Sequence, residues 1–521
     1  MAKSPLISAL KTAFRLSMSS ESSDIQALIE EEQAKQISRR LFLSQSAKAG
    51  LWLGASTMLP QWVYAAKNPP KIAVIGAGLA GLTAAYQLKK AGLAVDIYEG
   101  SKRLGGRVHS KPVLSRGLMP ELGGEFIDSQ HLEILQLIKE FNLELLDMQD
   151  AKSKLQPLAC SIAGQAYGMK DFVKEFKNVA PQIIKDKKSI DFALSSPSAI
   201  QLDKTPLKQY IESWGTSQWF KEMMHLAYTT EFGLETDEQS ALNLIQTIGT
   251  DLNKFQPLGE GDARFKIKGG NDLLIDKLSA DFESSMNLGH VLRFVEQKGK
   301  KYVLTFEKDR SGSTFDVEYD FAILAIPFST MREFTLKVKD IPKEKVQCVK
   351  ELGYGTNAKL IVGMMRRVWR DLGYEGNVFS DEIQSGWDNS LMLNGNTGPG
   401  GYTIFTGGKV GAEFNHFHDI AMTRKWLPKL DKVFLGAKEA HNGYTTIADW
   451  SKQSLFKGSQ ACYKVGQQTT LGGWEAKPLK NLLFAGEHCS QQFRGTMNGA
   501  VETGKAAATL IISRLKGESN G

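Results

Sequence analysis

A glycine-rich turn between an apolar run and a helical pattern constrains this chain most. The run Lys71–Ile75 leads into Gly76-Ala-Gly78-Leu-Ala-Gly81, and a helical pattern follows over residues 82–90. A second apolar run ends at Glu99, 18 residues after Gly81. In such a unit the three glycines permit a tight turn, close approach to a pyrophosphate and contact between helix and strand, while the acid faces a ribose. The sequence therefore predicts a parallel sheet that binds a dinucleotide.

The segment after Glu99 indicates which dinucleotide is bound. Glu99-Gly-Ser-Lys-Arg-Leu-Gly-Gly-Arg107 resembles the extended fingerprint of FAD-binding amine oxidases and their relatives. The resemblance implies that the second glycine pair folds the chain over the pyrophosphate and that Arg107 neutralises it. An ordinary surface loop with basic residues is the alternative. The residues expected to hold FAD at this end are Gly76, Gly78, Leu79, Ala80, Gly81, Glu99, Gly100 and Arg107.

Further segments extend the resemblance over the rest of the chain. They are Phe265–Asn271, Leu288–Val291, Phe321–Pro327, Leu483–His488 and Gly495–Ala500, in the order found in the flavin-containing amine oxidase superfamily of monoamine oxidases, polyamine oxidases and L-amino-acid oxidases. The resemblance implies an α/β protein with a discontinuous, Rossmann-like FAD-binding domain and an α+β substrate-binding domain. We expect the FAD-binding domain at residues 67–144, 256–340 and 447–515. The substrate-binding domain is expected at 145–255 and 341–446, and a short tail at 516–521.

The C-terminal segment is expected to contact the reactive end of the flavin. Leu482–Ala485 is an apolar strand ending in a glycine turn, and residues 496–512 have a helical, alanine-rich pattern. A helix start directs free N–H groups at an acceptor, which stabilises the negative charge of a reduced flavin. Simple capping of the helix against a sheet is the alternative. The residues expected to contact FAD here are Gly486, Glu487, Thr496 and Met497, and the resemblance adds Val291 at the adenine and Gly123, Gly124 and Glu125 beneath the flavin.

Lys359 is the candidate catalytic residue. The segment Gly353–Val362 resembles the strand that carries the family's flavin-site lysine, which holds a water near flavin N5. An unpaired ammonium in an otherwise apolar strand is costly to bury, so a functional partner explains Lys359 better than packing does. The alternative is a lysine at the strand edge whose ammonium reaches water.

Two acids bear on the substrate. The resemblance to polyamine oxidases implies that Asp128 and Glu231 line the substrate tunnel; alternatively, Asp128 caps a helix and Glu231 is solvated. Hydride transfer needs a neutral amine, and a carboxylate beside the reacting nitrogen would favour its ammonium form. Acids in the tunnel should therefore hold a second, distal cation, which favours a diamine, a polyamine or a basic amino acid.

The paired tyrosines of monoamine oxidases are replaced in this sequence. Thr496 stands at one of these positions and Gln460 at the other, with Tyr463 or Trp474 as substitutes. Arg494 is the candidate partner for a substrate carboxylate. Cys462 lies near the segment that tethers the flavin in monoamine oxidases, but its spacing is wrong, so we expect non-covalent FAD.

The first 66 residues are expected to be an export leader and not part of the fold. Arg39-Arg40 precedes an apolar stretch of about 12 residues, and Val63-Tyr-Ala-Ala66 follows; the pattern resembles a twin-arginine signal. An amphipathic helix with an incidental arginine pair is the alternative. The apolar stretch is shorter than the roughly 20 residues that span a bilayer. We expect a protein that is cytoplasmic before export and periplasmic or secreted after it, without a stable membrane span.

Composition excludes several other classes. The net charge of +7 is mildly basic and spread along the chain, without the Lys/Arg stripes of a nucleic-acid-binding protein. The pair His416 and His418 has no third ligand at supportive spacing, so no metal is expected.

The sequence therefore predicts an FAD-dependent oxidase that converts a primary or secondary amine to an imine by hydride transfer to flavin N5, with O2 reduced to H2O2. The alternatives are an L-amino-acid oxidase and a non-amine FAD oxidoreductase such as a desaturase.

Overall fold

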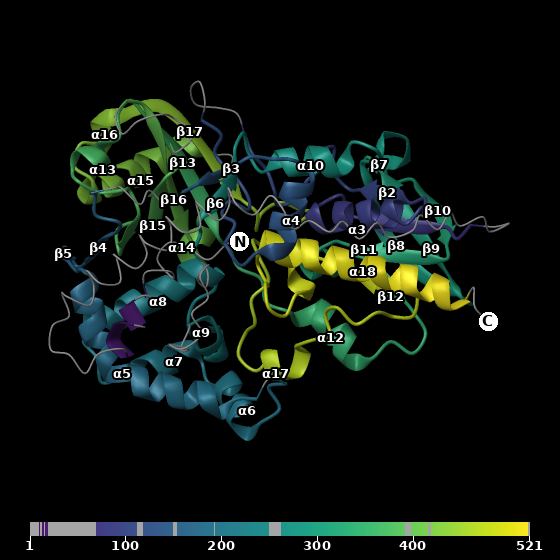
Figure 1. The fold of residues 1–521 in the computed structure, drawn as a ribbon, viewed down its shortest axis with the longest axis horizontal. Coiled ribbons are helices and arrows are strands. Elements are labelled where there is room, and N and C mark those ends of the chain that lie inside the picture. Colours follow the sequence, from purple (N-terminus) through teal and green to yellow (C-terminus); the bar gives the residue numbers. More distant parts are fainter. Residues whose placement is uncertain are drawn as a thin grey trace, which may run out of the picture.

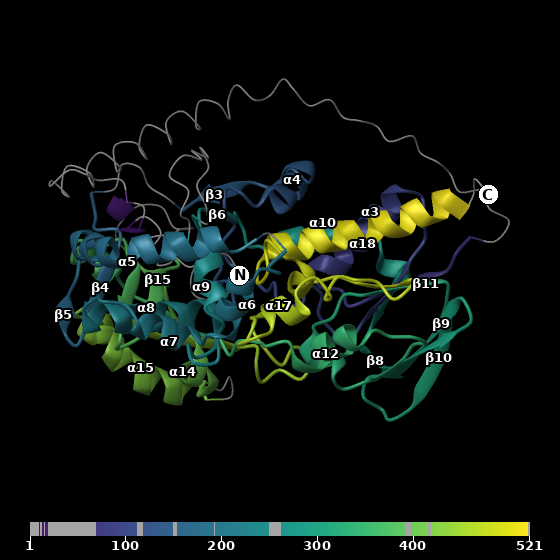
Figure 2. The ribbon, with the colours of Figure 1, turned by 90° about the horizontal axis from the view of Figure 1, so that it is seen from below.

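The computed structural model describes residues 69–111, 118–148, 154–191, 193–248, 262–390, 398–414 and 418–518, together with a few residues between 10 and 18 (Figure 1). The described chain contains two large sheets, each covered by helices. Figure 2 shows α5, α7 and α8 at one end of the molecule and β8, β9 and β10 at the other.

The first sheet is parallel and has five strands in the order β18-β11-β1-β2-β7. Its strands are β1 (Ile72–Ile75), β2 (Asp96–Glu99), β7 (Met286–Leu288), β11 (Phe321–Leu324) and β18 (Leu482–Phe484). Side chains alternate along β1: Ile72 and Val74 pack against helices, while Ala73 and Ile75 pack on the opposite face. The helices are α3 (Leu79–Lys90), α4 (Leu132–Glu140), α10 (Asp272–Ser279) and α18 (Met497–Glu518), and α3 and α18 lie side by side.

A four-stranded sheet, β10-β9-β8-β12, covers that opposite face. Its strands are β8 (His290–Lys298), β9 (Lys301–Lys308), β10 (Thr314–Tyr319) and β12 (Thr335–Lys337). The short helices α11 (Phe328–Met331), α12 (Lys343–Glu351) and α17 (Gln468–Leu471) complete this half, together with the 3-10 turns at Glu283–Ser285 and Glu487–Cys489.

The second large sheet has seven strands in the order β17-β13-β16-β15-β14-β4-β5. They are β4 (Ala159–Ile162), β5 (Gln165–Ala166), β13 (Ala358–Met364), β14 (Val378–Ser380), β15 (Gln384–Asp388), β16 (Gly400–Thr406) and β17 (His441–Asp449). The associated helices are α5 (Met169–Ser189), α6 (Pro197–Lys204), α7 (Leu207–Glu212), α8 (Gln218–Phe232), α9 (Leu242–Thr247), α13 (Val368–Asp371), α14 (Gly408–Ala412), α15 (Asp419–Val433) and α16 (Ala437–Ala440). This architecture confirms the predicted fold class, since every strand of the parallel sheet comes from the three segments expected to bind FAD.

The structure moves several of the predicted domain boundaries. Helix α12 was expected in the second domain, but Cys348 packs with Ile75 and Leu324 of the parallel sheet. Strand β17 continues to Asp449, past the expected boundary at 446/447, because it pairs with β13 along its length. Strand β3 (Leu145–Asp147), expected in the second domain, pairs with β6 (Phe265–Ile267) of the expected FAD-binding domain. The boundary at 515/516 falls inside α18, which runs into the expected tail.

A few residues of the expected leader belong to the fold. Leu10, Ala13, Phe14 and Leu16 are buried in the core of the α5–α9 helices, and the Phe14 ring meets the Phe176 ring edge-on at 5.3 Å. The prediction that nothing before residue 67 is folded was therefore wrong for this segment, because its apolar face packs against other helices. The arginine pair lies outside the described residues. Within the described residues, no helix is long and apolar enough to cross a membrane.

Candidate active site

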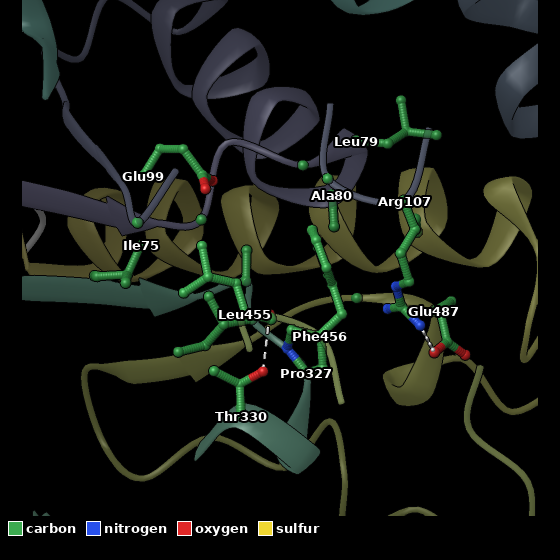
Figure 3. A pocket seen from close by; sticks show the side chains of 18 of the residues that line it. Ile75, Leu79, Ala80, Glu99, Arg107, Pro327, Thr330, Leu455, Phe456 and Glu487 are labelled. Atoms are coloured by element: carbon green, nitrogen blue, oxygen red, sulfur yellow. Dashed lines mark hydrogen bonds and ion pairs between the residues drawn. The ribbon is translucent and has the colours of Figure 1, made fainter. Parts of the chain in front are cut away.

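A cavity of about 370 Å³ opens at the carboxyl ends of the parallel strands. Most of the residues predicted to bind the cofactor line it, namely Gly76, Gly78, Leu79, Ala80, Glu99, Gly100, Arg107, Gly124, Val291, Gly486, Glu487, Thr496 and Met497. Figure 3 shows side chains from the β1–α3 turn, β2 and the C-terminal segment around one space. The cavity thus brings together residues from both ends of the described chain.

The turn after β1 has no room for larger residues. Gly76 has a φ of +104°, and a Cβ there would lie 2.6 Å from the carbonyl oxygen of Ala325. Gly81 does not line the cavity, but a Cβ on it would lie 1.9 Å from the Gly76 carbonyl oxygen. Gly81 therefore has the packing role that its place in the motif predicts. The start of α3 is brought against the turn in this way.

Glu99 closes the same turn. Its Oε2 accepts a hydrogen bond from the Ala77 N–H at 2.9 Å, and its Oε1 accepts one from the Ser101 N–H at 2.8 Å. The carboxylate is held by backbone donors while it lines the cavity, at the place expected for a ribose contact.

An ion pair joins the two distant parts of the cavity. Arg107 Nη1 lies 2.9 Å from Glu487 Oε1 and also donates to the Ser459 carbonyl at 2.8 Å (Figure 3). Glu487 accepts further bonds from the N–H groups of Ala461 and Gly495. Burial alone would raise the pKa of Glu487, but Arg107 and the other positive charges around the carboxylate together outweigh burial and lower that pKa. Glu487 is thus a charged carboxylate that fixes the C-terminal segment against Arg107.

Helix α18 begins at the cavity wall. Thr496 Oγ1 accepts a hydrogen bond from the Gly499 N–H at 3.0 Å, which is a helix cap, and both Thr496 and Met497 line the cavity. Capping and a contact with the cavity, which the sequence left as alternatives, therefore occur together. The N-terminus of a 22-residue helix directs its partial positive charge there.

Lys359 is not among the residues that line the cavity, but it lies next to them. Strand alternation turns Leu360 and Val362 toward α15, while Lys359 faces the loop at residues 121–125. Its Nζ donates to the carbonyl oxygens of Glu121 and Gly123 at 2.8 and 2.9 Å, and to Glu125 Oε2 at 2.7 Å. Next to these acceptors, Gly124 lines the cavity. The lysine is buried and paired, as expected from the cost of burying it alone.

Comparison with known proteins identifies the family. The sequence profile of the flavin containing amine oxidoreductase family matches residues 79–512. The chain belongs to this family.

The chain is similar to members of this family along most of its length. It is 25% identical over 464 residues to polyamine oxidase 3 of Oryza sativa subsp. japonica, covering 86% of this chain and 90% of that protein. It is 24% identical over 463 residues to an L-amino acid dehydrogenase of Synechocystis sp., covering 85% and 94%.

Solved structures share the fold. Cyclohexylamine oxidase from Brevibacterium oxydans IH-35A gives a TM-score of 0.74 at 20% identity, covering 86% of this chain and all of that one. Putrescine oxidase bound to putrescine gives 0.72 at 19% identity, covering 86% and 99%.

Family membership confirms an FAD-dependent amine oxidoreductase, and the cavity fits FAD. Gly76, Glu99 and Arg107 all line it, so Arg107 would supply a cation for a pyrophosphate and Glu99 an acceptor for a ribose. Cys462 is absent from the lining; its thiol is buried near Asn243, and burial raises its pKa to about 12. Non-covalent attachment stays a prediction.

Two residues of the segment beneath the expected flavin have other contacts. A Cβ on Gly123 would lie 1.7 Å from the Arg107 carbonyl oxygen, so this glycine serves close packing. Glu125 was expected to contact FAD, but its carboxylate lies between Lys359 and Lys266. The sequence missed Lys266; its position in the apolar run Phe265–Ile267 is the signal that could have found it.

The structure places the expected substrate residues in different surroundings. Gln460 lines the cavity, and its Nε2 donates to the Glu231 carbonyl. Asp128 is buried instead: its Oδ1 accepts from the Ala263 N–H at 2.8 Å, and α4 begins only at Leu132, so it does not cap that helix. A tunnel role for the Glu231 carboxylate stays a prediction.

Three further substrate candidates lie among other partners, away from the cavity lining. Tyr463 donates to Glu475 Oε1 at 2.6 Å, and Arg494 lies over the Tyr463 ring and 3.4 Å from the same carboxylate oxygen. Trp474 packs at the edge of this group, under Lys477. The roles predicted for Tyr463 and Trp474 beside the amine, and for Arg494 at a substrate carboxylate, stay predictions. The buried acid Glu475 attracts the arginine and the tyrosine.

Proposed function

We propose that this amine oxidoreductase oxidises a diamine or polyamine to an imine and passes the electrons to O2, forming H2O2. The observation that carries the choice of substrate is the engagement of Arg494. This arginine, the sequence's candidate for binding a substrate carboxylate, is held by Glu475 and Tyr463. The neutral amide of Gln460 is the expected substrate residue that lines the cavity. The similarity to a putrescine oxidase and a polyamine oxidase supports the same class.

The residues of the chain have distinct tasks in this reaction. Bound FAD would supply a hydride acceptor at N5 and a two-electron donor for oxygen. Arg107 and the start of α3 would hold its negatively charged pyrophosphate, and the N-terminus of α18 would stabilise negative charge at the flavin ring. Lys359 supplies a positive charge beside Gly124. Because the carboxylates of Asp128 and Glu125 are engaged elsewhere, they do not hold the reacting amine as its ammonium form.

L-amino-acid oxidation is the second candidate, favoured by the similarity to the Synechocystis dehydrogenase. Anaerobic bleaching of the flavin absorbance separates the two. Putrescine and spermidine should bleach the flavin, and L-amino acids should leave it oxidised. Bleaching by L-amino acids alone would overturn the diamine proposal.

Admitting air to the bleached enzyme tests the electron acceptor. O2 should restore the oxidised spectrum within seconds, and a reduced flavin that persists in air would contradict the oxidase proposal.

We also propose that the arginine pair directs export of the folded protein to the periplasm. Arg39→Lys combined with Arg40→Lys should retain the protein in the cytoplasm, as measured by cell fractionation. Unchanged export of the double variant would contradict this proposal.

A further inference from the structure

A buried group of charges beside the cavity connects the seven-stranded sheet with the short β3-β6 sheet and the loop before α4. It consists of Glu125 from the loop before α4, Lys266 from β6, Lys359 from β13 and the Trp387 indole from β15. We call these four residues the lysine cluster. Their exposed fractions are small: 3% for Glu125, 4% for Lys359 and 7% for Lys266. Such charges remain buried only when they are paired and hydrogen-bonded.

The Lys359 ammonium is fully hydrogen-bonded. Three acceptor oxygens, the carbonyls of Glu121 and Gly123 and the Glu125 carboxylate, lie 2.7–2.9 Å from Nζ. A protonated lysine has three N–H donors and no acceptor, so these oxygens match its donors one for one.

Glu125 is itself held from two sides. Its Oε1 accepts hydrogen bonds from Lys266 Nζ and from Trp387 Nε1, the latter at 2.9 Å, while its Oε2 binds Lys359. Burial would raise the pKa of Glu125, but Lys266 and Lys359 outweigh it and lower that pKa to about 2. Within the lysine cluster, one carboxylate is therefore shared by two lysines.

The cluster touches the cavity through backbone. Lys359 bonds to Gly123 and Glu125, and Gly124 between them lines the cavity. A Cβ on Gly124 would lie 2.8 Å from Met497 Cγ, so this loop is also pressed against the start of α18. A movement of Glu125 would therefore move both the ammonium and the cavity wall.

We propose that Glu125 is a positioning residue that fixes Lys359 as a charged, fully hydrogen-bonded ammonium beside Gly124, with Lys266 and Trp387 holding Glu125 in place. The inference rests on the proposed function, in that FAD occupies the cavity and Lys359 acts on it. Lys359 then contributes a fixed positive charge near the flavin and does not act as a free base.

The test compares Glu125→Gln and Lys359→Met in the FAD-loaded enzyme. Glu125→Gln removes a negative charge and should make the midpoint potential of the flavin more positive, whereas Lys359→Met should make it more negative. In stopped-flow experiments, Glu125→Gln should slow the same half-reaction as Lys359→Met, by about 10-fold or more. The double variant should be no slower than Lys359→Met. An unchanged potential, or a double variant slowed by the product of the two single effects, would overturn the proposal.

Two further variants keep the test decisive. Asp388→Asn is the matched control, because Asp388 is similarly buried, accepts a hydrogen bond from the Trp369 indole and lies 3.0 Å from Arg370, but is outside the cavity lining; the flavin potential and half-reactions of this variant should match wild type. If Glu125→Gln does not fold, Glu125→Gln combined with Lys266→Met keeps the wild-type net charge. This variant should have a near-wild-type flavin potential and still react slowly, and wild-type rates would contradict the positioning role of Glu125.

Failure of amines to bleach the wild-type flavin would refute the proposed function alone, since the potentials are measured without an amine.

Discussion

The two ends of the candidate active site are built in different ways. The nucleotide end comes from one continuous stretch, in which β1, the glycine turn, α3 and β2 follow one another within residues 72–99. The lysine cluster takes its four side chains from four segments spread over residues 125–387. At the nucleotide end, the backbone geometry of the glycine turn shapes the site. At the lysine cluster, buried side-chain charges from separate segments balance one another. A single substitution in the glycine turn should therefore abolish FAD binding. Substitutions in the lysine cluster should instead reduce the reaction rates by different amounts.

The most damaging change is expected in the glycine turn. Gly81→Val would place a branched side chain where even a Cβ lies 1.9 Å from the Gly76 carbonyl oxygen. We expect loss of bound FAD or of soluble protein, measured by flavin absorbance per protein. Lys89→Val, on the exposed face of the same helix, should retain FAD. A stable Gly81→Val protein that still binds FAD would contradict this role of the glycine turn.

The second half of the molecule depends on a residue far away in sequence. Phe14→Ala removes a fully buried ring from the core of α5–α9 and should lower the free energy of unfolding by about 3 kcal/mol or more. Thermal or urea unfolding measures this effect. Met18→Ala, at a less buried position of the same segment, should cost less. Equal stability of Phe14→Ala and wild type would show that this segment is dispensable.

Lys359→Met tests the charge itself. With FAD still bound, we expect flavin reduction or reoxidation to slow by about 100-fold, because a fixed charge near the reacting ring is lost. Stopped-flow absorbance follows both half-reactions. Wild-type rates in both would remove Lys359 from the mechanism.

Arg107→Ala should weaken FAD binding more than it slows the half-reactions, which is the reverse of the effect expected for Lys359→Met. The variant loses the partner of Glu487 and the cation at the pyrophosphate, so FAD should bind about 10-fold more weakly. Titration of the apoprotein with FAD measures the dissociation constant. When FAD is saturating, the half-reactions should be much closer to wild type than those of Lys359→Met, and an unchanged dissociation constant would argue against the pyrophosphate role.

The smallest effect concerns Lys345, a buried lysine outside both ends. Its Nζ donates to the Glu475 carbonyl and lies over the Phe484 ring. Burial lowers its pKa from 10.5 to about 8. Between these values the unfolded chain binds the proton that the folded protein has lost, so stability should rise with pH. In Lys345→Met this rise should be smaller by about 1 kcal/mol per pH unit. Unfolding curves at pH 8, 9 and 10 measure the difference, and parallel curves would contradict it.

The accuracy of the sequence predictions follows the same division. Gly76, Glu99 and Arg107, predicted to bind the cofactor, line one cavity because each lies within a short motif whose geometry is local. Tyr463 and Arg494 were expected near the substrate, but their partner Glu475 was not recognisable from sequence. Similarly, the carboxylate of Glu125 was assigned to the cofactor, since its neighbour Lys266 comes from a strand 141 residues away.

The sequence by itself determined the parallel sheet, the phosphate-binding turn and the type of cofactor. The short apolar runs and the spacing of the glycines indicate the sheet and the turn, and the resemblance of Glu99–Arg107 to the FAD fingerprint indicates the cofactor. Only the tertiary structure decided which charges meet. The pairing of Lys359 with Glu125 and of Arg494 with Glu475 depends on how whole sheets pack, because a buried charge is stabilised by groups that reach it through space and not along the chain.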